Sequence, residues 1–123
     1  MNTKFELEDF NARILERLQQ TEDRFAELEK MLGDPEVLAD QSNYQKIAKE
    51  FSDISPAVET LRAYREGIRQ LAELETLLAD NADQELCSLA KAEWKELKER
   101  KREQEQHLFD FVHPKEEDKN QDI

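Results

Sequence analysis

The sequence predicts an all-α protein, an elongated antiparallel three-helix bundle with coiled-coil-like packing. Two observations support this class. Leu, Glu, Lys, Ala and Gln are abundant while Val is scarce, and this composition favours helix over strand. The 123 residues include only two glycines and three prolines, which leaves few residues for tight turns between strands. The length suits one domain, which we expect over residues 1–112, followed by a disordered polar tail at 113–123 that acts as a linker.

The first charged run predicts one amphipathic helix over about residues 5–32, because its apolar residues recur at helical steps. Charged side chains fill the positions between them, and Thr21 interrupts the stripe where a core residue is expected. The stripe consists of Leu7, Phe10, Ile14, Leu18, Phe25, Leu28 and Leu32.

A break follows in the segment "LGDP". We expect Gly33 to end the first helix in the left-handed conformation that glycine adopts without strain. Asp34 is a good N-cap, and Pro35 is suited to the first position of a new helical turn. After this short turn, Asp40 or Ser42 can cap the chain again.

The helical pattern resumes and predicts a second helix over about residues 44–79. Pro56 lies inside it, so the helix either kinks or restarts with Ser55 as its cap. The apolar stripe crosses Pro56 without losing phase, which favours the kink. The stripe consists of Ile47, Phe51, Ile54, Val58, Leu61, Ile68, Leu71, Leu74 and Leu78.

A second break at Asp80, Asn81 and Asp83 precedes a third helix, predicted over about residues 84–110. Short connections between long helices make neighbours antiparallel, which gives the up-down-up order. The third stripe thins between Leu97 and Leu108, so we expect that end of the helix to project beyond the others. Its apolar residues are Leu86, Leu89, Ala90, Trp94, Leu97 and Leu108.

The net charge of −12 argues against a free-standing nucleic-acid binder, although it leaves room for a local contact. No apolar run approaches the length of a membrane helix, and the acidic N-terminus does not resemble a secretory signal. The single cysteine, Cys87, has no partner for an internal disulfide. These features predict a cytoplasmic protein without membrane contact.

Signals for catalysis are weak. Two isolated glycines cannot form a phosphate-binding loop. A possible metal site is the set of His107, Asp110 and His113, which recur at steps of three. His113 precedes a proline and is therefore biased away from helix, so a solvated helix end is favoured over a metal site. Cys87 is better interpreted as a small, partly buried residue than as a nucleophile, and Trp94 as an interhelical contact. We therefore predict no catalytic residue, cofactor or metal.

Two other segments have both a structural and a functional interpretation. The basic tract Lys95, Lys98, Arg100, Lys101 and Arg102 could contact phosphates from a projecting helix end. A solvated surface is the favoured interpretation, because interleaved glutamates such as Glu96, four residues before Arg100, favour local ion pairs. The segment Leu108, Phe109, Phe111 and Val112 is either the end of the core or an interface with a neighbouring domain.

Several motifs resemble the N-terminal helical domain of bacterial peptide chain release factor 1. They are Asp34-Pro35, the segment from Tyr44 to Glu50, Pro56 with Val58, and the segment from Tyr64 to Glu66. "DQELCSLAKAEWKELKER" resembles the next family segment. "HPKEEDKNQDI" resembles the family's linker, except that it has Glu116-Glu117 and lacks the second proline. The resemblance covers about residues 24–123, and the ordered series of breaks is its most specific feature.

The resemblance implies a non-catalytic domain that supports translation termination at stop codons. Its expected partners are the stalk base of the large ribosomal subunit (protein and rRNA), the remaining domains of the factor and the GTPase release factor. The family's Gly-Thr-Gly-Gly, Pro-x-Thr and Gly-Gly-Gln elements are absent from this sequence, which suggests a fragment. The alternative is a stand-alone helical adaptor or coiled-coil interaction protein that self-associates through residues 108–112; a monomer is favoured over a dimer.

Overall fold

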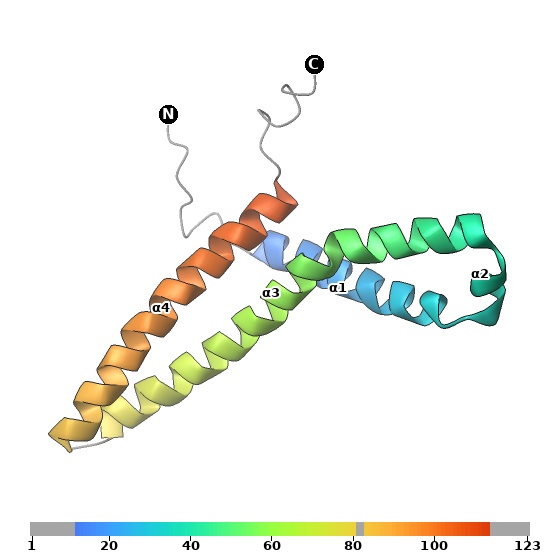
Figure 1. Ribbon diagram of the computed structural model, residues 1–123. Coiled ribbons are helices and arrows are strands. Elements are labelled where there is room, and N and C mark those ends of the chain that lie inside the picture. Colours follow the sequence, from blue (N-terminus) through green and yellow to red (C-terminus); the bar gives the residue numbers. More distant parts are fainter. Residues whose placement is uncertain (1–11, 81–82, 114–123) are drawn as a thin grey trace, which may run out of the picture.

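The computed structural model describes residues 12–80 and 83–113, and these ranges are almost entirely helical (Figure 1). They form α1 (Ala12–Leu32), α2 (Pro35–Ala39), α3 (Gln41–Asp80) and α4 (Gln84–Val112). No strand occurs in the described ranges, which confirms the all-α class. Residues 5–11 of the predicted first helix, with Leu7 and Phe10, and the predicted tail beyond His113 lie outside the described residues.

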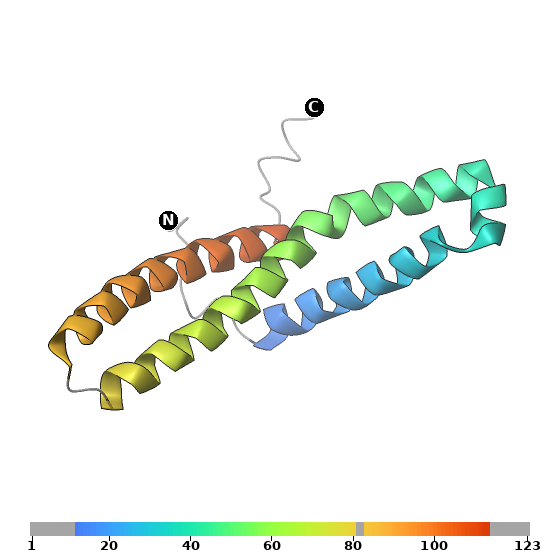
Figure 2. The ribbon, with the colours of Figure 1, turned by 60° about the horizontal axis from the view of Figure 1, so that its bottom comes forward.

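The long helices form two antiparallel pairs that share α3 (Figures 1 and 2). α1 lies along the N-terminal half of α3, and α4 lies along its C-terminal half. With 40 residues, α3 is about 60 Å long, so neither shorter partner can cover it alone. The up-down-up order agrees with the predicted bundle, but the three helices pack together only near the middle of α3.

Two buried clusters hold this arrangement together. The central cluster joins all three long helices and consists of Ile14, Leu18, Leu61, Tyr64, Leu108 and Val112. The distal cluster joins α1, α2 and α3 through Leu28, Val37 and Ile47. Next to it, the rings of Phe25 and Phe51 stack with their centroids 4.5 Å apart. Apolar burial at these two points therefore fixes α1 against α3 along its length.

Ion pairs reinforce the contact between α1 and α3. Arg24 Nε and Nη2 donate to the two carboxylate oxygens of Glu50 at 2.7 and 2.8 Å, a bidentate geometry. Arg62 and Arg65 both donate to Glu22, at 2.9 and 2.7 Å. These arginines lower the pKa of Glu22, with the hydrogen bond from Arg65 as the largest cause.

The end of α1 differs from the prediction. No described residue has a positive φ, so Gly33 does not adopt the left-handed conformation. Instead, its N–H donates to the Lys30 carbonyl at 3.0 Å, and the Asp34 N–H donates to the Met31 carbonyl at 3.1 Å. These i to i−3 bonds tighten the last turn and satisfy carbonyls that the helix leaves open.

The predicted caps are formed by aspartates. The Asp34 carboxylate accepts from the Glu36 N–H at 3.0 Å, with Pro35 beginning α2. Of the two residues expected to cap the chain again, Asp40 accepts the Asn43 N–H at 3.2 Å. Asp83 accepts from the first turn of α4, at 3.0 and 3.3 Å. Each bond satisfies a backbone donor that has no partner within its helix.

α3 passes through Pro56 as one helix, so the restart at Ser55 does not occur. It bends near its middle, in the green part that contains Pro56 (Figure 1). Proline removes one hydrogen bond and crowds the preceding turn, which is a recognised cause of such bends. The predicted kink is therefore confirmed, and it turns the two helix pairs away from a common straight axis.

The C-terminal half of α4 does not project, contrary to the prediction. Leu97 and Leu108 are buried against the rest of the domain, and Glu105 between them is only 2% exposed. The apolar stripe thins there because a buried glutamate occupies a core position, not because the helix leaves the core. The parts that project are instead the C-terminal end of α3 and the N-terminal end of α4 (Figure 1).

Candidate functional site

The basic tract on α4 points in three directions, because its five residues span more than one helical turn. Lys101 faces inward, with its Nζ 2.8 Å from the buried Glu105 carboxylate. Lys95, Lys98 and Arg102 recur at steps of three and four and share one exposed side of the helix. Arg100 lies on the other side of α4, beside a groove against α3.

Lys91 extends the exposed side by one turn, and sequence reasoning missed it. We call Lys91, Lys95, Lys98 and Arg102 the basic flank; their steps of four, three and four residues keep them on one face. In the part of the chain that the structure describes, no carboxylate lies within 4 Å of a charged nitrogen of this flank. The predicted ion pair of Glu96 with Arg100, which lies outside the flank, is also not formed. Among the described residues, the flank therefore carries four cations without an ion pair, on a protein with a net charge of −12.

Lys101 belongs to a buried polar cluster at the centre of the domain. The Tyr64 hydroxyl donates to Glu105 Oε2 at 2.7 Å, and Lys101 Nζ donates to the same oxygen at 2.8 Å. Burial, and then the hydrogen bond to Glu105, raise the pKa of Tyr64 well above its ordinary value. The cluster satisfies a buried carboxylate and gives Lys101 a structural role, so Lys101 is poorly placed to contact a partner.

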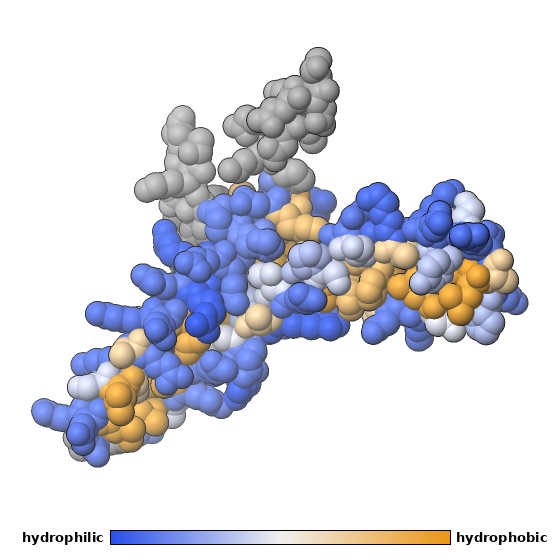
Figure 3. All heavy atoms as spheres, in the orientation of Figure 1, coloured by the Kyte–Doolittle hydropathy of each residue, from blue (hydrophilic) through white to orange (hydrophobic). Residues whose placement is uncertain are grey.

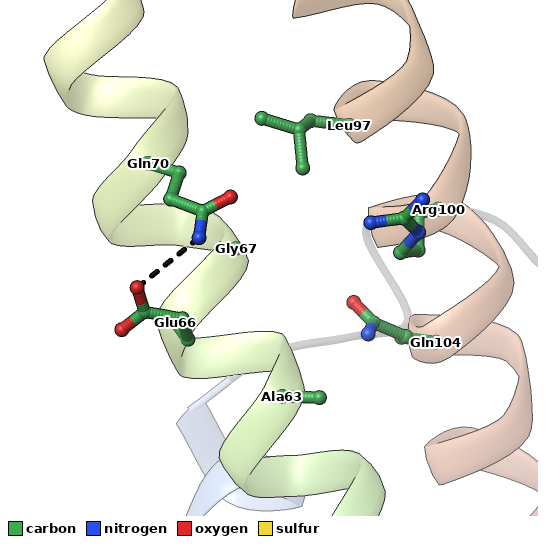
Figure 4. Close-up of a pocket in the computed structure, with 7 residues that line it drawn as sticks. All are labelled: Ala63, Glu66, Gly67, Gln70, Leu97, Arg100 and Gln104. Carbon is green, nitrogen blue, oxygen red and sulfur yellow. Dashed lines mark hydrogen bonds between the residues drawn. The ribbon is translucent and has the colours of Figure 1, made fainter. Parts of the chain in front are cut away.

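Arg100 lines a shallow groove of about 190 Å³ between α3 and α4 (Figure 4). Gly67 borders open space in this groove, because a Cβ at this position would meet nothing within 4 Å. The amide of Gln70 donates to Glu66 at 3.1 Å, and Glu66 also pairs with Arg69. The lining residues are Ala63, Glu66, Gly67, Gln70, Leu97, Arg100 and Gln104. These residues form a recess of mixed polar and apolar lining, in which we find no paired acid and base for catalysis.

A second groove, of about 350 Å³, lies near the projecting end of the molecule and is lined by Glu75, Leu78, Lys91, Trp94 and Lys95. Trp94 Nε1 donates to Glu75 Oε2 at 3.0 Å, which bridges α4 and α3 and confirms the interhelical role predicted for this tryptophan. Lys98 Nζ lies 5.4 Å from the centroid of the Trp94 ring. We call this feature the Trp94 groove. Hydrophobic surface gathers at this end of the molecule (Figure 3).

The segment predicted as core end or interface divides between the two roles. Leu108 and Val112 are buried in the central cluster, and Phe109 packs against it. Phe111 is the exposed member, with 36% of its surface accessible. Phe111 is therefore the member of this segment that leaves the most apolar surface accessible.

The residues considered for catalysis or metal binding do not converge. His107 is exposed, Asp110 accepts from Gln106 Nε2 at 3.0 Å, and the His113 ring lies 5.0 Å from that of Phe109. Cys87 is partly buried. Among residues 12–80 and 83–113, no three His, Cys, Asp or Glu side chains are grouped so that they could hold a metal ion.

None of the helices in the described ranges has the length and apolar character needed to cross a membrane.

Comparison with known proteins identifies the family. The sequence model of the PCRF domain family matches residues 21–123 of this chain. The chain is 36% identical over 110 residues to peptide chain release factor 1 of Ligilactobacillus salivarius, covering 88% of this chain and 31% of that protein. It is 37% identical over 102 residues to the protein of the same name from Caldicellulosiruptor saccharolyticus, covering 83% and 29%. For the Listeria welshimeri protein, the identity is 39% over 109 residues, covering 87% and 30%.

The chain thus spans about 30% of the length of these relatives. No solved structure matches it. The matched region includes α2, α3, α4 and most of α1, and so contains both the basic flank and the Trp94 groove. The chain belongs to the PCRF domain family.

Proposed function

We propose that this chain is the ribosome-contacting helical domain of a class 1 peptide chain release factor and supports translation termination at stop codons. The family match and the relatives named peptide chain release factor 1 support this setting. The observation on which the proposed contact rests is the basic flank, which carries four cations without an ion pair among the described residues of a chain with net charge −12.

The flank suits a ribosomal surface that exposes phosphates. Lys91 and Arg102 are 11 positions apart, so the flank is about 16 Å long, enough to follow several phosphates of an RNA strand. The acidic remainder of the chain disfavours nonspecific RNA binding and confines the contact to this side of α4. The partner we propose is the stalk base of the large subunit, with both protein and rRNA.

The role we propose is positioning, not chemistry. The sequence contains no Gly-Gly-Gln or Pro-x-Thr segment, and we assign peptidyl-tRNA hydrolysis and codon reading to other domains of a release factor. Phe111 is the exposed apolar residue that we expect to meet such a domain. In this setting the chain acts in the cytoplasm as a monomer, and its position on the ribosome influences exchange with the GTPase release factor.

The test is binding of the chain to ribosomes over a range of salt concentrations. Replacing Lys95, Lys98 and Arg102 with Gln should weaken binding and lower the slope of log K against log salt by about 0.7–0.9 for each lost phosphate contact. The matched control replaces Arg17, Lys30 and Lys46 with Gln. These three cations are also exposed, so the change in net charge is the same. The control should bind as the unmodified chain does.

Activity assays complete the test. The chain should compete with intact release factor 1 for termination complexes and release no peptide itself. Peptide release by the chain alone, or equal weakening by both triple variants, would contradict the proposal. A dimer that persists at low concentration in sedimentation, together with no ribosome binding, would favour the adaptor function instead.

A further inference from the structure

We propose that the Trp94 groove binds a short acidic segment of a partner protein, which inserts one apolar side chain between α3 and α4. The inference deepens the proposed function and rests on it for its biological setting, since Lys91 and Lys95 belong to both the groove and the basic flank. It concerns a protein ligand, whereas the flank is assigned to phosphates.

The floor of the groove is apolar and held in place. Leu78 from α3 and Trp94 from α4 line it, and the indole N–H is fixed by its 3.0 Å hydrogen bond to Glu75. A volume of about 350 Å³ is at the lower end of ligand pockets and suits one large side chain better than a whole helix face. Because the tryptophan is already oriented, an inserted side chain gains contact without the cost of ordering the ring.

The rim determines the charge of the ligand. Lys91 and Lys95 line the groove, and Lys98 lies 5.4 Å from the Trp94 ring centroid. None of the three has an ion pair among the described residues. Two ammonium groups that line the groove, and a third over the Trp94 ring, complement a ligand with carboxylates on both sides of an apolar side chain.

An RNA strand fits this groove less well. Lys98 lies over the Trp94 ring, where an unpaired base would need a free face for stacking. A second copy of the chain could supply an acidic segment, because Leu38 in α2 is 55% exposed and lies between Glu36 and Asp40. The test therefore includes both alternatives.

Trp94 is the only tryptophan in the chain, so its fluorescence reports directly on the groove. The probe is a capped, tryptophan-free peptide with Leu-Phe between acidic triplets. We expect a saturable change in emission that weakens as salt rises. A matched peptide with Ala-Ala in place of Leu-Phe should bind at least about tenfold more weakly, because it buries less apolar surface.

Two variants assign the binding to the groove. Replacing Lys91 and Lys95 with Gln should weaken binding of the acidic peptide about tenfold, and replacing Leu78 with Ala should weaken it several-fold. The control, Lys30→Gln with Lys46→Gln, changes the net charge equally and should bind unchanged. Circular dichroism confirms that each variant is folded before titration.

Three results would overturn the inference. The first is that the Leu-Phe peptide causes no saturable change in Trp94 emission. The second is that the Ala-Ala peptide binds as tightly as the Leu-Phe peptide, and the third is that an oligouridine binds more tightly than the Leu-Phe peptide. If the chain self-associates and Leu38→Asp abolishes the association, the groove binds a second copy of the chain. That result would overturn the proposal that its ligand belongs to another protein. The titration contains no ribosomes. If it fails while the flank variant still weakens ribosome binding, only the present inference falls.

Discussion

Replacing Tyr64 with Phe should lower the free energy of unfolding by about 1.5–3 kcal/mol, the value of a hydrogen bond to a charged group. The substitution removes only the hydroxyl that donates to Glu105 at 2.7 Å. The ring stays in the central cluster, so almost no apolar contact is lost. The Glu105 side chain is 3% exposed, and water cannot readily replace the missing donor.

The remaining partner limits the loss. Lys101 Nζ still donates to the carboxylate at 2.8 Å, so Glu105 is not left as an isolated buried charge, which would cost more. A double-mutant cycle with Glu105→Gln measures the pair itself. We expect a coupling free energy of about 0.5–3 kcal/mol between the two positions.

Urea unfolding followed by circular dichroism measures both quantities. Tyr44 is the chain's other tyrosine and is exposed, so Tyr44→Phe is a matched control that should change stability by less than about 0.5 kcal/mol. If the two Tyr→Phe variants unfold at the same urea concentration, the hydrogen bond to Glu105 does not contribute as argued.

The same contact predicts a response to high pH. Burial and the hydrogen bond to Glu105 raise the pKa of Tyr64 above its ordinary value of 10.0. Above that pH the unfolded chain loses the tyrosine proton while the folded chain keeps it, so stability is complete below about pH 10 and falls as pH rises. Tyr64→Phe should make this alkaline fall shallower.

Three further predictions concern other parts of the domain. Glu22→Gln should reduce the loss of stability on acidification. Two arginines hold the pKa of Glu22 below its ordinary value of 4.5, and the stability that this carboxylate contributes disappears as pH falls through the lowered pKa. Urea unfolding at neutral and at acidic pH measures the difference. Gly67→Ala should raise the free energy of unfolding by about 0.5–1 kcal/mol, since it lies inside α3 and an added Cβ meets nothing within 4 Å; an unchanged urea midpoint would contradict this. Leu28→Ala should cost about 2–5 kcal/mol because Leu28 is fully buried, whereas Leu38→Ala at an exposed position should cost less than about 0.5 kcal/mol in the same assay.

Local features of the fold could be predicted because their causes lie within a few residues. Asp34 and Asp83 cap helices with backbone groups two or three positions away. The kink at Pro56 follows from the proline ring and its missing N–H, and the unbroken phase of the apolar stripe favoured a kink over a restart. Gly33 is the exception, because a tight last turn satisfied the same carbonyls without a left-handed residue.

The position of the C-terminal half of α4 could not be predicted from apolar spacing. Glu105 follows Lys101 by four positions and precedes Leu108 by three, so it is in phase with the core. A glutamate at such a position is normally interpreted as exposed, since burial of a lone carboxylate is costly. Its partner, Tyr64, is 41 positions away, and only the fold brings the two together.

The candidate site was partly visible in the sequence. The five cations were grouped because they are close together in sequence, but on a helix they point in three different directions. They are Lys95, Lys98, Arg100, Lys101 and Arg102. Phase alone could have added Lys91, which lies four positions before Lys95. It could not have shown that Lys101 is paired with a buried carboxylate. Nor could it have shown that Glu75 of α3 meets Trp94 of α4 to form a groove.

Among the described residues, the ion pairs that join different helices lie between α1 and α3 and not at the basic flank. In the pair of α1 with α3, Arg24, Arg62 and Arg65 reach across to carboxylates 26 to 43 positions away in sequence. The basic flank on α4 makes no such contact within the described residues. Exposed ion pairs contribute little to stability, whereas uncompensated cations dominate binding to polyanions. Raising salt should therefore weaken binding through the flank much more than it lowers the stability of the fold.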